Sequence, residues 1–265
     1  MLSVSWQPST WVMLQCALKE HFNSAWMPPD MKHQYFGDIN DYRKYGLLRL
    51  LSGGTLRLGV CWMLTLDDGR TDGKFIQYLH APHIWRAYDP PLFDALHQVV
   101  NVARLRSVHQ AEQLSILPAA DFYTHLLFDN RMQRQGYFQR MLQQFQDVDL
   151  VFFDPDNGIE TASVKLGQKA SSKFLYWSEL LTTYQGGHSV LFYQHFRREE
   201  RSTFIKRIAA DIQGRIPATD VYAFRTAHVM FFLVAQPQHT MHFRRQIAHI
   251  TEIWTTQIQV DTFIA

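Results

Sequence analysis

Three short, almost continuous apolar runs constrain the fold of this chain more than any other feature of its sequence. They cover residues 56–64 (LRLGVCWML), 150–153 (LVFF) and 189–193 (SVLFY). Strands that are covered on both faces have this continuous character, and they are typical of parallel sheets whose connections are helices. The runs therefore predict an α/β protein with buried central strands.

Segments with helical spacing of apolar residues lie between and around these runs. We expect helices over residues 40–51, 90–102, 119–128, 131–145, 177–184, 197–212 and 243–258. Two further strand-like runs, 220–224 and 229–234, are separated only by residues 225–228, which predicts an antiparallel hairpin. The sequence thus predicts a doubly wound mixed α/β sheet of the Rossmann-like class, mostly parallel with a C-terminal antiparallel hairpin.

Composition narrows the class of protein further. The 265 residues are 46% hydrophobic, so the chain can bury a core, and a formal net charge of +2 gives it no global basic field. Two cysteines exclude a disulfide framework and a cysteine zinc site. No apolar run reaches the roughly 20 residues that span a bilayer. We therefore expect a cytoplasmic protein that does not enter membranes.

The first thirty residues differ in character from the rest of the chain. Pro28-Pro29 breaks the chain, and a new start comes at Met31. We expect residues 1–30 to be an N-terminal appendage and residues 31–265 to form a single Rossmann-like domain. A helix packed on the core is the alternative for the first segment.

Acidic residues follow the second apolar run directly, in the stretch LVFFDPDNGIE, residues 150–160. Ligands of open α/β sheets bind beyond the carboxyl ends of the strands, which is where this stretch places Asp154. Three carboxylates within seven residues need a cation, a donor-rich substrate or good solvation. An Asx turn followed by a helix N-cap is the alternative. The predicted catalytic residues are Asp154, Pro155, Asp156, Asn157 and His195.

His195 enters this set because it follows the third apolar run. It lies beside Asp154 if the two strands are neighbours, and a histidine there can act as a general base or a ligand. An ordinary surface histidine is the alternative, because the chain contains 13 of them.

Two further polar stretches are candidates for cofactor binding. Residues 35–48 carry Asp38, Asp41 and Lys44 near one face of a predicted helix, although a capped, solvated helix start has the same pattern. Residues 65–73 come after the first predicted strand and offer carboxylates for a ribose or backbone N–H groups for a phosphate, without a GxGxxG motif. The predicted cofactor-binding residues are Asp38, Asp41, Lys44, Asp67, Asp72 and Gly73.

Basic residues gather around the third strand and the helix predicted after it. Such a group can hold phosphates, although a solvated helix face is the alternative. The predicted nucleic-acid-binding residues are Lys169, Lys173, Arg197, Arg198 and Arg201.

The stretches GDINDYRKY (37–45) and FDPDNGIE (153–160) carry a resemblance to a known family. The chain resembles Rossmann-like, S-adenosylmethionine-dependent amino-methyltransferases, among them the bacterial enzymes that methylate an adenine N6 in large-subunit ribosomal RNA. It is still more similar to a group of uncharacterised bacterial proteins that share both stretches. The hairpin over 220–234 is similar to the reversed final strand of this fold.

The resemblance implies an activity and a cofactor. In the ribosomal enzymes a strand ends in Asp/Asn-Pro-Pro-Tyr/Phe; the acidic or amide residue and the next carbonyl hold the target amine, and the aromatic ring stacks on the flipped base. Asp154-Pro155 matches the first half of that motif, whereas Asp156-Asn157 departs from the second. The implied function is methyl transfer from S-adenosylmethionine to an amine of a nucleic acid, with residues 67–73 replacing the usual glycine-rich loop.

Two other functions remain open from the residues alone. One is a metal-dependent nuclease or phosphoesterase in which Asp154, Asp156 and Glu160 bind Mg²⁺ or Mn²⁺. The other is a non-catalytic binding module on the same scaffold, which the missing glycine-rich loop favours.

Overall fold

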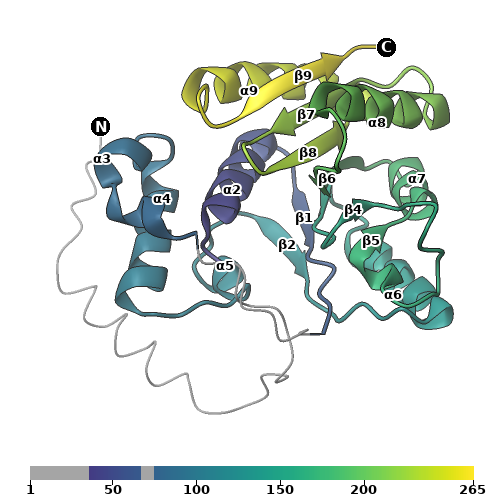
Figure 1. The fold of residues 1–265 in the computed structure, drawn as a ribbon, viewed down its shortest axis with the longest axis horizontal. Helices are drawn as coiled ribbons and strands as arrows, with labels where there is room; N and C mark the ends of the chain where they lie inside the picture. The colour runs from purple at the N-terminus through teal and green to yellow at the C-terminus, as the bar shows by residue number, and fades with distance from the viewer. Residues whose placement is uncertain (1–35, 67–74) are drawn as a thin grey trace. The chain divides into compact units, whose positions relative to one another are not determined.

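A seven-stranded sheet in the order β2-β1-β3-β6-β8-β7-β9 organises the chain (Figure 1). The computed structural model describes residues 36–66 and 75–265. The sheet strands are β1 (Leu58–Cys61), β2 (Ala120–Tyr123), β3 (Leu150–Phe153), β6 (Ser189–His195), β7 (Val221–Arg225), β8 (Val229–Val234) and β9 (Gln259–Phe263). A separate parallel pair consists of β4 (Gly158–Ile159) and β5 (Phe174–Leu175).

Most of the sheet is parallel. β2, β1, β3 and β6 run in one direction, β8 runs antiparallel to β6, and β7 pairs antiparallel with both β8 and β9. β7 therefore points the same way as the parallel strands, and β8 is a reversed strand between β6 and β7. The predicted mixed α/β class with its terminal hairpin is confirmed.

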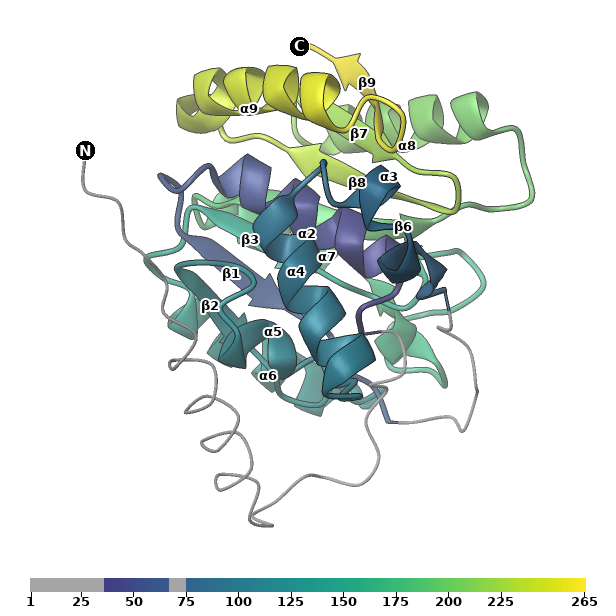
Figure 2. The ribbon, with the colours of Figure 1, turned by 90° about the vertical axis from the view of Figure 1, so that its left-hand side faces the viewer.

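Helices cover both faces of the sheet (Figure 2). The longer ones are α2 (Ile39–Ser52), α4 (Pro90–His97), α6 (Arg131–Gln144), α7 (Trp177–Gln185), α8 (Arg201–Arg215) and α9 (Thr240–Ile253), and α3 (Pro82–Trp85) and α5 (Gln110–Gln113) are single turns. One face packs against α6, α7 and α8. α2 contacts both α4 and α9 and approaches the other face, where Tyr45 packs against Trp62.

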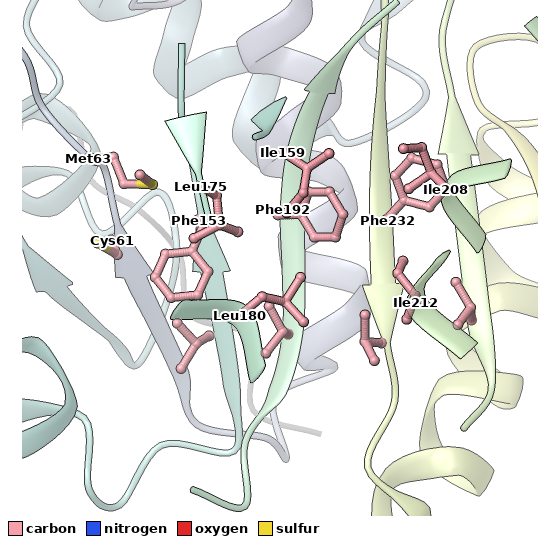
Figure 3. Packing of buried hydrophobic residues seen from close by; sticks show 14 of the residues in the cluster. Cys61, Met63, Phe153, Ile159, Leu175, Leu180, Phe192, Ile208, Ile212 and Phe232 are labelled. Carbon is pink, nitrogen blue, oxygen red and sulfur yellow. The ribbon is translucent and has the colours of Figure 1, made fainter. Parts of the chain in front are cut away.

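Alternate strand residues form the core beneath α7 and α8 (Figure 3). Phe153, Phe192 and Phe232 stand opposite one another on β3, β6 and β8, so they form one row across the sheet. Ile208 and Ile212 of α8 belong to the same buried cluster. Since these residues are fully or almost fully buried, the central strands are fixed firmly relative to one another.

One predicted helix is wrong in type, and several predicted elements differ from the structure in extent. Residues 119–128 were expected to be helical, but residues 120–123 form β2, because pairing with β1 prevails over an apolar spacing that also fits a helix. The last helix ends at Ile253 rather than 258, and the chain then adds β9 beside β7.

The helix predicted over 197–212 begins four residues later, at Arg201. Glu200 is its N-cap, and the carboxylate of that residue accepts hydrogen bonds from the N–H groups of Ser202 and Thr203 at 2.9 and 2.7 Å. Arg197 and Arg198 therefore lie in the loop that connects β6 with α8. In the other direction, the third predicted strand continues two residues further, so that it includes His195.

The predicted N-terminal appendage, residues 1–30, lies outside the described residues, and the division into appendage and domain stays a prediction. Among residues 36–66 and 75–265, none of the helices has both the length and the apolar character that crossing a bilayer requires.

Candidate functional site

Asp154 lies at the point where the order of the strands reverses. β2 pairs with one edge of β1 and β3 with the other, so the connections from the carboxyl ends of β1 and β3 lead in opposite directions. Such a switch point opens a crevice that α/β proteins use for ligands. The N–H of Asp154 donates to the carbonyl of Cys61 at 3.1 Å, which fixes this residue at the crevice.

The start of α2 forms one wall of the site. The Asp38 carboxylate is the N-cap and accepts hydrogen bonds from the N–H groups of Asn40 and Asp41 at 2.8 and 3.0 Å. Asp41 accepts from the Gly37 N–H at 3.0 Å and from the Tyr45 hydroxyl at 3.2 Å. Both carboxylates are buried, and these hydrogen bonds fix the start of α2.

Lys44 joins this helix to the end of β3. Its Nζ lies 2.7 Å from Asp154 Oδ2 and 2.8 Å from Asp41 Oδ1, and its side chain is only 10% exposed. The ammonium also stands 5.2 Å from the centroid of the Trp62 ring and 5.3 Å from that of Tyr45. The structure thus brings Lys44 and Asp41 of the predicted cofactor-binding set together with Asp154 of the predicted catalytic set.

Burial and the ion pairs together decide the protonation states of Lys44 and Asp154. Burial lowers the pKa of Lys44, but the carboxylates of Asp154 and Asp41 outweigh it and raise that pKa above its ordinary value. Burial raises the pKa of Asp154, and Lys44 offsets only part of the rise. Lys44 therefore stays protonated, so it acts as a counter-ion and not as a nucleophile or a base.

Asp38, the N-cap of α2, is also buried. Burial, reinforced by the nearby Asp41, raises the pKa of its carboxyl to about 6. The N-cap of α2 therefore titrates at mildly acidic pH, close to the site.

A glutamine on β6 holds the loop that comes after Asp154. The Gln194 amide accepts from the Ile159 N–H at 2.8 Å and donates to the Asn157 carbonyl at 3.2 Å. Gly158, with φ +99°, lies so close to this amide that a Cβ would collide with it. The loop therefore has one defined course, and the glycine of the FDPDNG stretch is required by that contact.

The end of β6 lies beside Asp154, as predicted, because β3 and β6 are neighbours. The Tyr193 hydroxyl and His195 Nε2 are 3.1 Å apart. Burial raises the pKa of Tyr193 strongly, and the carboxylates of Asp154 and Asp38 add to the rise. Partial burial of the His195 imidazole lowers its pKa more than the nearby Asp156 raises it, so the ring is mainly neutral at pH 7. The Tyr193 hydroxyl thus lies close to Asp154 and Asp38, and it is hydrogen-bonded to the imidazole of His195.

The rest of the acidic stretch is divided between the site and the scaffold. Asp156 lies 3.9 Å from Lys173 Nζ, and Asn157 is held through its backbone. Glu160 instead accepts a hydrogen bond from the Trp177 N–H at 2.7 Å, at the start of α7. Glu160 therefore does not join Asp154. In the described part of the chain, no group of three or more His, Cys, Asp or Glu residues is placed to hold a metal ion.

The predicted basic residues separate into anchored and exposed ones. Arg197 donates to the Glu160 carbonyl at 3.4 Å and Arg201 to the Ala227 carbonyl at 3.1 Å. Arg198 and Lys169 lie exposed in loops. Asp67, Asp72 and Gly73, predicted to bind the cofactor, lie outside the described residues.

Sequence reasoning assigned no role to three residues of this site, although it noted Tyr193-Gln194 beside His195 at the end of the third predicted strand. Gln194 had a signal, because a buried amide in an apolar strand needs partners. The signal for Tyr193 was weaker: its side chain ends in a hydroxyl, and it lies on β6 next to the end of β3. Trp62 reads simply as part of an apolar run, so nothing in the sequence distinguishes it.

No protein-family model matches the sequence, and no curated protein is detectably similar to it. Among solved structures, the chain is similar to the crystal structure of protein LPL1258 from Legionella pneumophila, assigned to the family model DUF519. The superposition covers 88% of this chain and 98% of the other at 8% identity, with a TM-score of 0.44. A likeness this loose says nothing about activity.

Proposed function

We propose that the protein transfers a methyl group from S-adenosylmethionine to an amine of a nucleic acid, with Asp154 as the residue that receives the amine. The observation that carries the proposal is the place of Asp154, at the carboxyl end of a central parallel strand and at the switch point of the sheet. The reversed strand β8 between β6 and β7 adds support, because the resembling family has a reversed final strand.

Two buried polar atoms just after β1 support the binding of a polar cofactor. Trp62 Nε1 and Thr65 Oγ1 are buried, and within the described residues neither has a hydrogen-bond partner. A buried donor left without a partner costs about 1 to 3 kcal/mol, so such atoms favour a ligand that satisfies them. By contrast, Asp38 and Asp41 are occupied by α2 itself, which limits them to shaping the wall of the site.

The bound cofactor supplies an activated methyl group, and the residues of this chain position the acceptor. Asp154 accepts a hydrogen bond from the amine and stabilises the positive charge that its nitrogen acquires. Lys44 keeps the Asp154 carboxylate oriented by a hydrogen bond to one of its oxygens. His195, neutral at pH 7, is the base at this edge that can take the proton lost by the methylated amine.

Two measurements test the proposal. Isothermal titration with S-adenosylmethionine and with its demethylated product is expected to show binding of both. Transfer of labelled methyl groups to RNA or DNA is then expected to fall at least about a hundredfold in Asp154→Ala, since the amine loses its acceptor.

The matched control is Asp147→Ala, which removes a carboxylate that is 65% exposed. This variant is expected to transfer methyl groups at the wild-type rate. Absence of binding to either ligand at millimolar concentration contradicts the proposal, as does an Asp154→Ala variant with unchanged transfer. Binding without transfer to any nucleic acid favours a non-catalytic module instead.

A further inference from the structure

An exposed aromatic pair stands at the edge of the candidate site. The rings of Phe75 and His228 are nearly parallel, with an interplanar angle of 11° and centroids 6.2 Å apart. Phe75 is 63% exposed although one side of its ring faces the imidazole. A large aromatic side chain that is ordered by stacking and still open to solvent offers a flat surface for another planar group.

Backbone contacts place this pair next to the site. The carbonyl of Phe75 accepts a hydrogen bond at 3.0 Å from the N–H of Ile39, the first residue of α2 after the Asp38 cap. His228 precedes Val229, which pairs with His195 across β6 and β8. The pair therefore lies between the start of α2 and the end of β6, the two elements that carry Lys44 and His195.

A positive charge is fixed beside the same turn. Arg201 donates to the carbonyl of Ala227, the residue before His228, at 3.1 Å. Its guanidinium also lies 4.3 Å from the centroid of the Phe196 ring. This arginine is exposed but held at two points, so its charge has a defined position close to the aromatic pair.

We infer that Phe75 stacks on a nucleobase of a single-stranded nucleic acid while Arg201 contacts the phosphate beside that base. Base stacking on aromatic side chains and contacts from cations to the backbone are the two means by which proteins hold single strands. The inference rests on the proposed nucleic-acid substrate and names its form.

Fluorescence anisotropy with labelled decamers tests the inference without cofactor or turnover. The probes are single-stranded RNA, single-stranded DNA, the DNA duplex and a DNA decamer of abasic sites. We expect the single strands to bind more tightly than the duplex and the abasic strand. Phe75→Ala is expected to weaken binding of the base-containing strands about 5- to 150-fold and that of the abasic strand little. Phe75→Trp is expected to retain binding.

Two further variants separate stacking from charge and from folding. Arg201→Met is expected to weaken all single strands alike and to reduce the salt dependence of binding. Phe128→Ala removes another exposed ring, 42% exposed, and is expected to bind as the wild type does. Equal binding of base-containing and abasic strands, an unaltered Phe75→Ala variant, or no binding of any strand overturns the inference. Methyl transfer is measured in a separate assay, so a failure of the stacking inference can be distinguished from a failure of the proposed activity.

Discussion

Replacing Lys44 with methionine tests the charge arrangement of the site most directly. The change removes the ammonium and keeps the length and most of the volume of the side chain. Asp154 and Asp41 would then face each other without the cation that lies 2.7 and 2.8 Å from them. We expect the folded state to lose stability, because two buried carboxylates are left without their counter-ion.

The size of the loss can be worked from the geometry. At an effective dielectric constant of about 20, two unit charges 2.7 Å apart attract by about 6 kcal/mol. Much of that attraction only offsets the desolvation of the ions, so removing one partner of a buried pair costs about 3 to 5 kcal/mol. For a domain of this size the corresponding fall in melting temperature is about 6 to 20 °C.

Calorimetry and urea unfolding across pH 5 to 8 provide the assay. Without Lys44 the pKa of Asp154 rises further, so the folded state binds more protons than the unfolded chain, and stability falls as pH increases. Adding Asp154→Asn should recover part of the loss. Lys206→Met, on the exposed side of α8, is the control and should stay within about 0.5 kcal/mol of the wild type. A Lys44→Met variant within about 1 kcal/mol of the wild type at pH 7, with an unaltered pH dependence, refutes the reasoning.

Two other variants probe the walls of the site. Gly158→Ala should destabilise the protein by about 2 kcal/mol or more in urea unfolding, because the new methyl group collides with Gln194. Gly187→Ala is its control, since φ is +94° there and nothing lies within 4 Å; equal losses in both variants would mean that backbone strain alone acts. Asp38→Asn keeps a good N-cap and removes a carboxyl whose pKa is raised to about 6. The stability of the wild type relative to this variant should therefore fall by about 2 to 3 kcal/mol as the pH rises from 4 to 7. Stability curves of the two proteins that stay parallel over this range would contradict the raised pKa of Asp38.

The central strands were predictable because burial on both faces leaves a continuous apolar run. All four residues of β3 are buried, and so are those of β1. The edge strands β2 and β9 are partly exposed and lack such a run. Their strand conformation comes from pairing with β1 and β7, which are distant in sequence, so local spacing predicts neither of them.

Sequence reasoning could select parts of the candidate site where the pattern is local. Asp154 was identified because an acidic residue follows a buried strand directly, and α2 because Asp38 has the sequence context of an N-cap. The ion pair between Lys44 and Asp154 joins positions 110 residues apart, so it depends on how α2 packs against the sheet. The stacking of Phe75 on His228 is likewise a product of the fold, since neither residue belongs to a recognisable motif.

The place of β3 in the sheet has a consequence for synthesis of the chain on the ribosome. β1 precedes β3 and can pair with it early, but β6, the partner on its other side, begins only at Ser189. Until that segment has been made, the nascent chain exposes four apolar residues along an unpaired strand edge, which is a template for association with other chains. Pausing during synthesis of residues 154–188 prolongs this exposure and therefore favours aggregation.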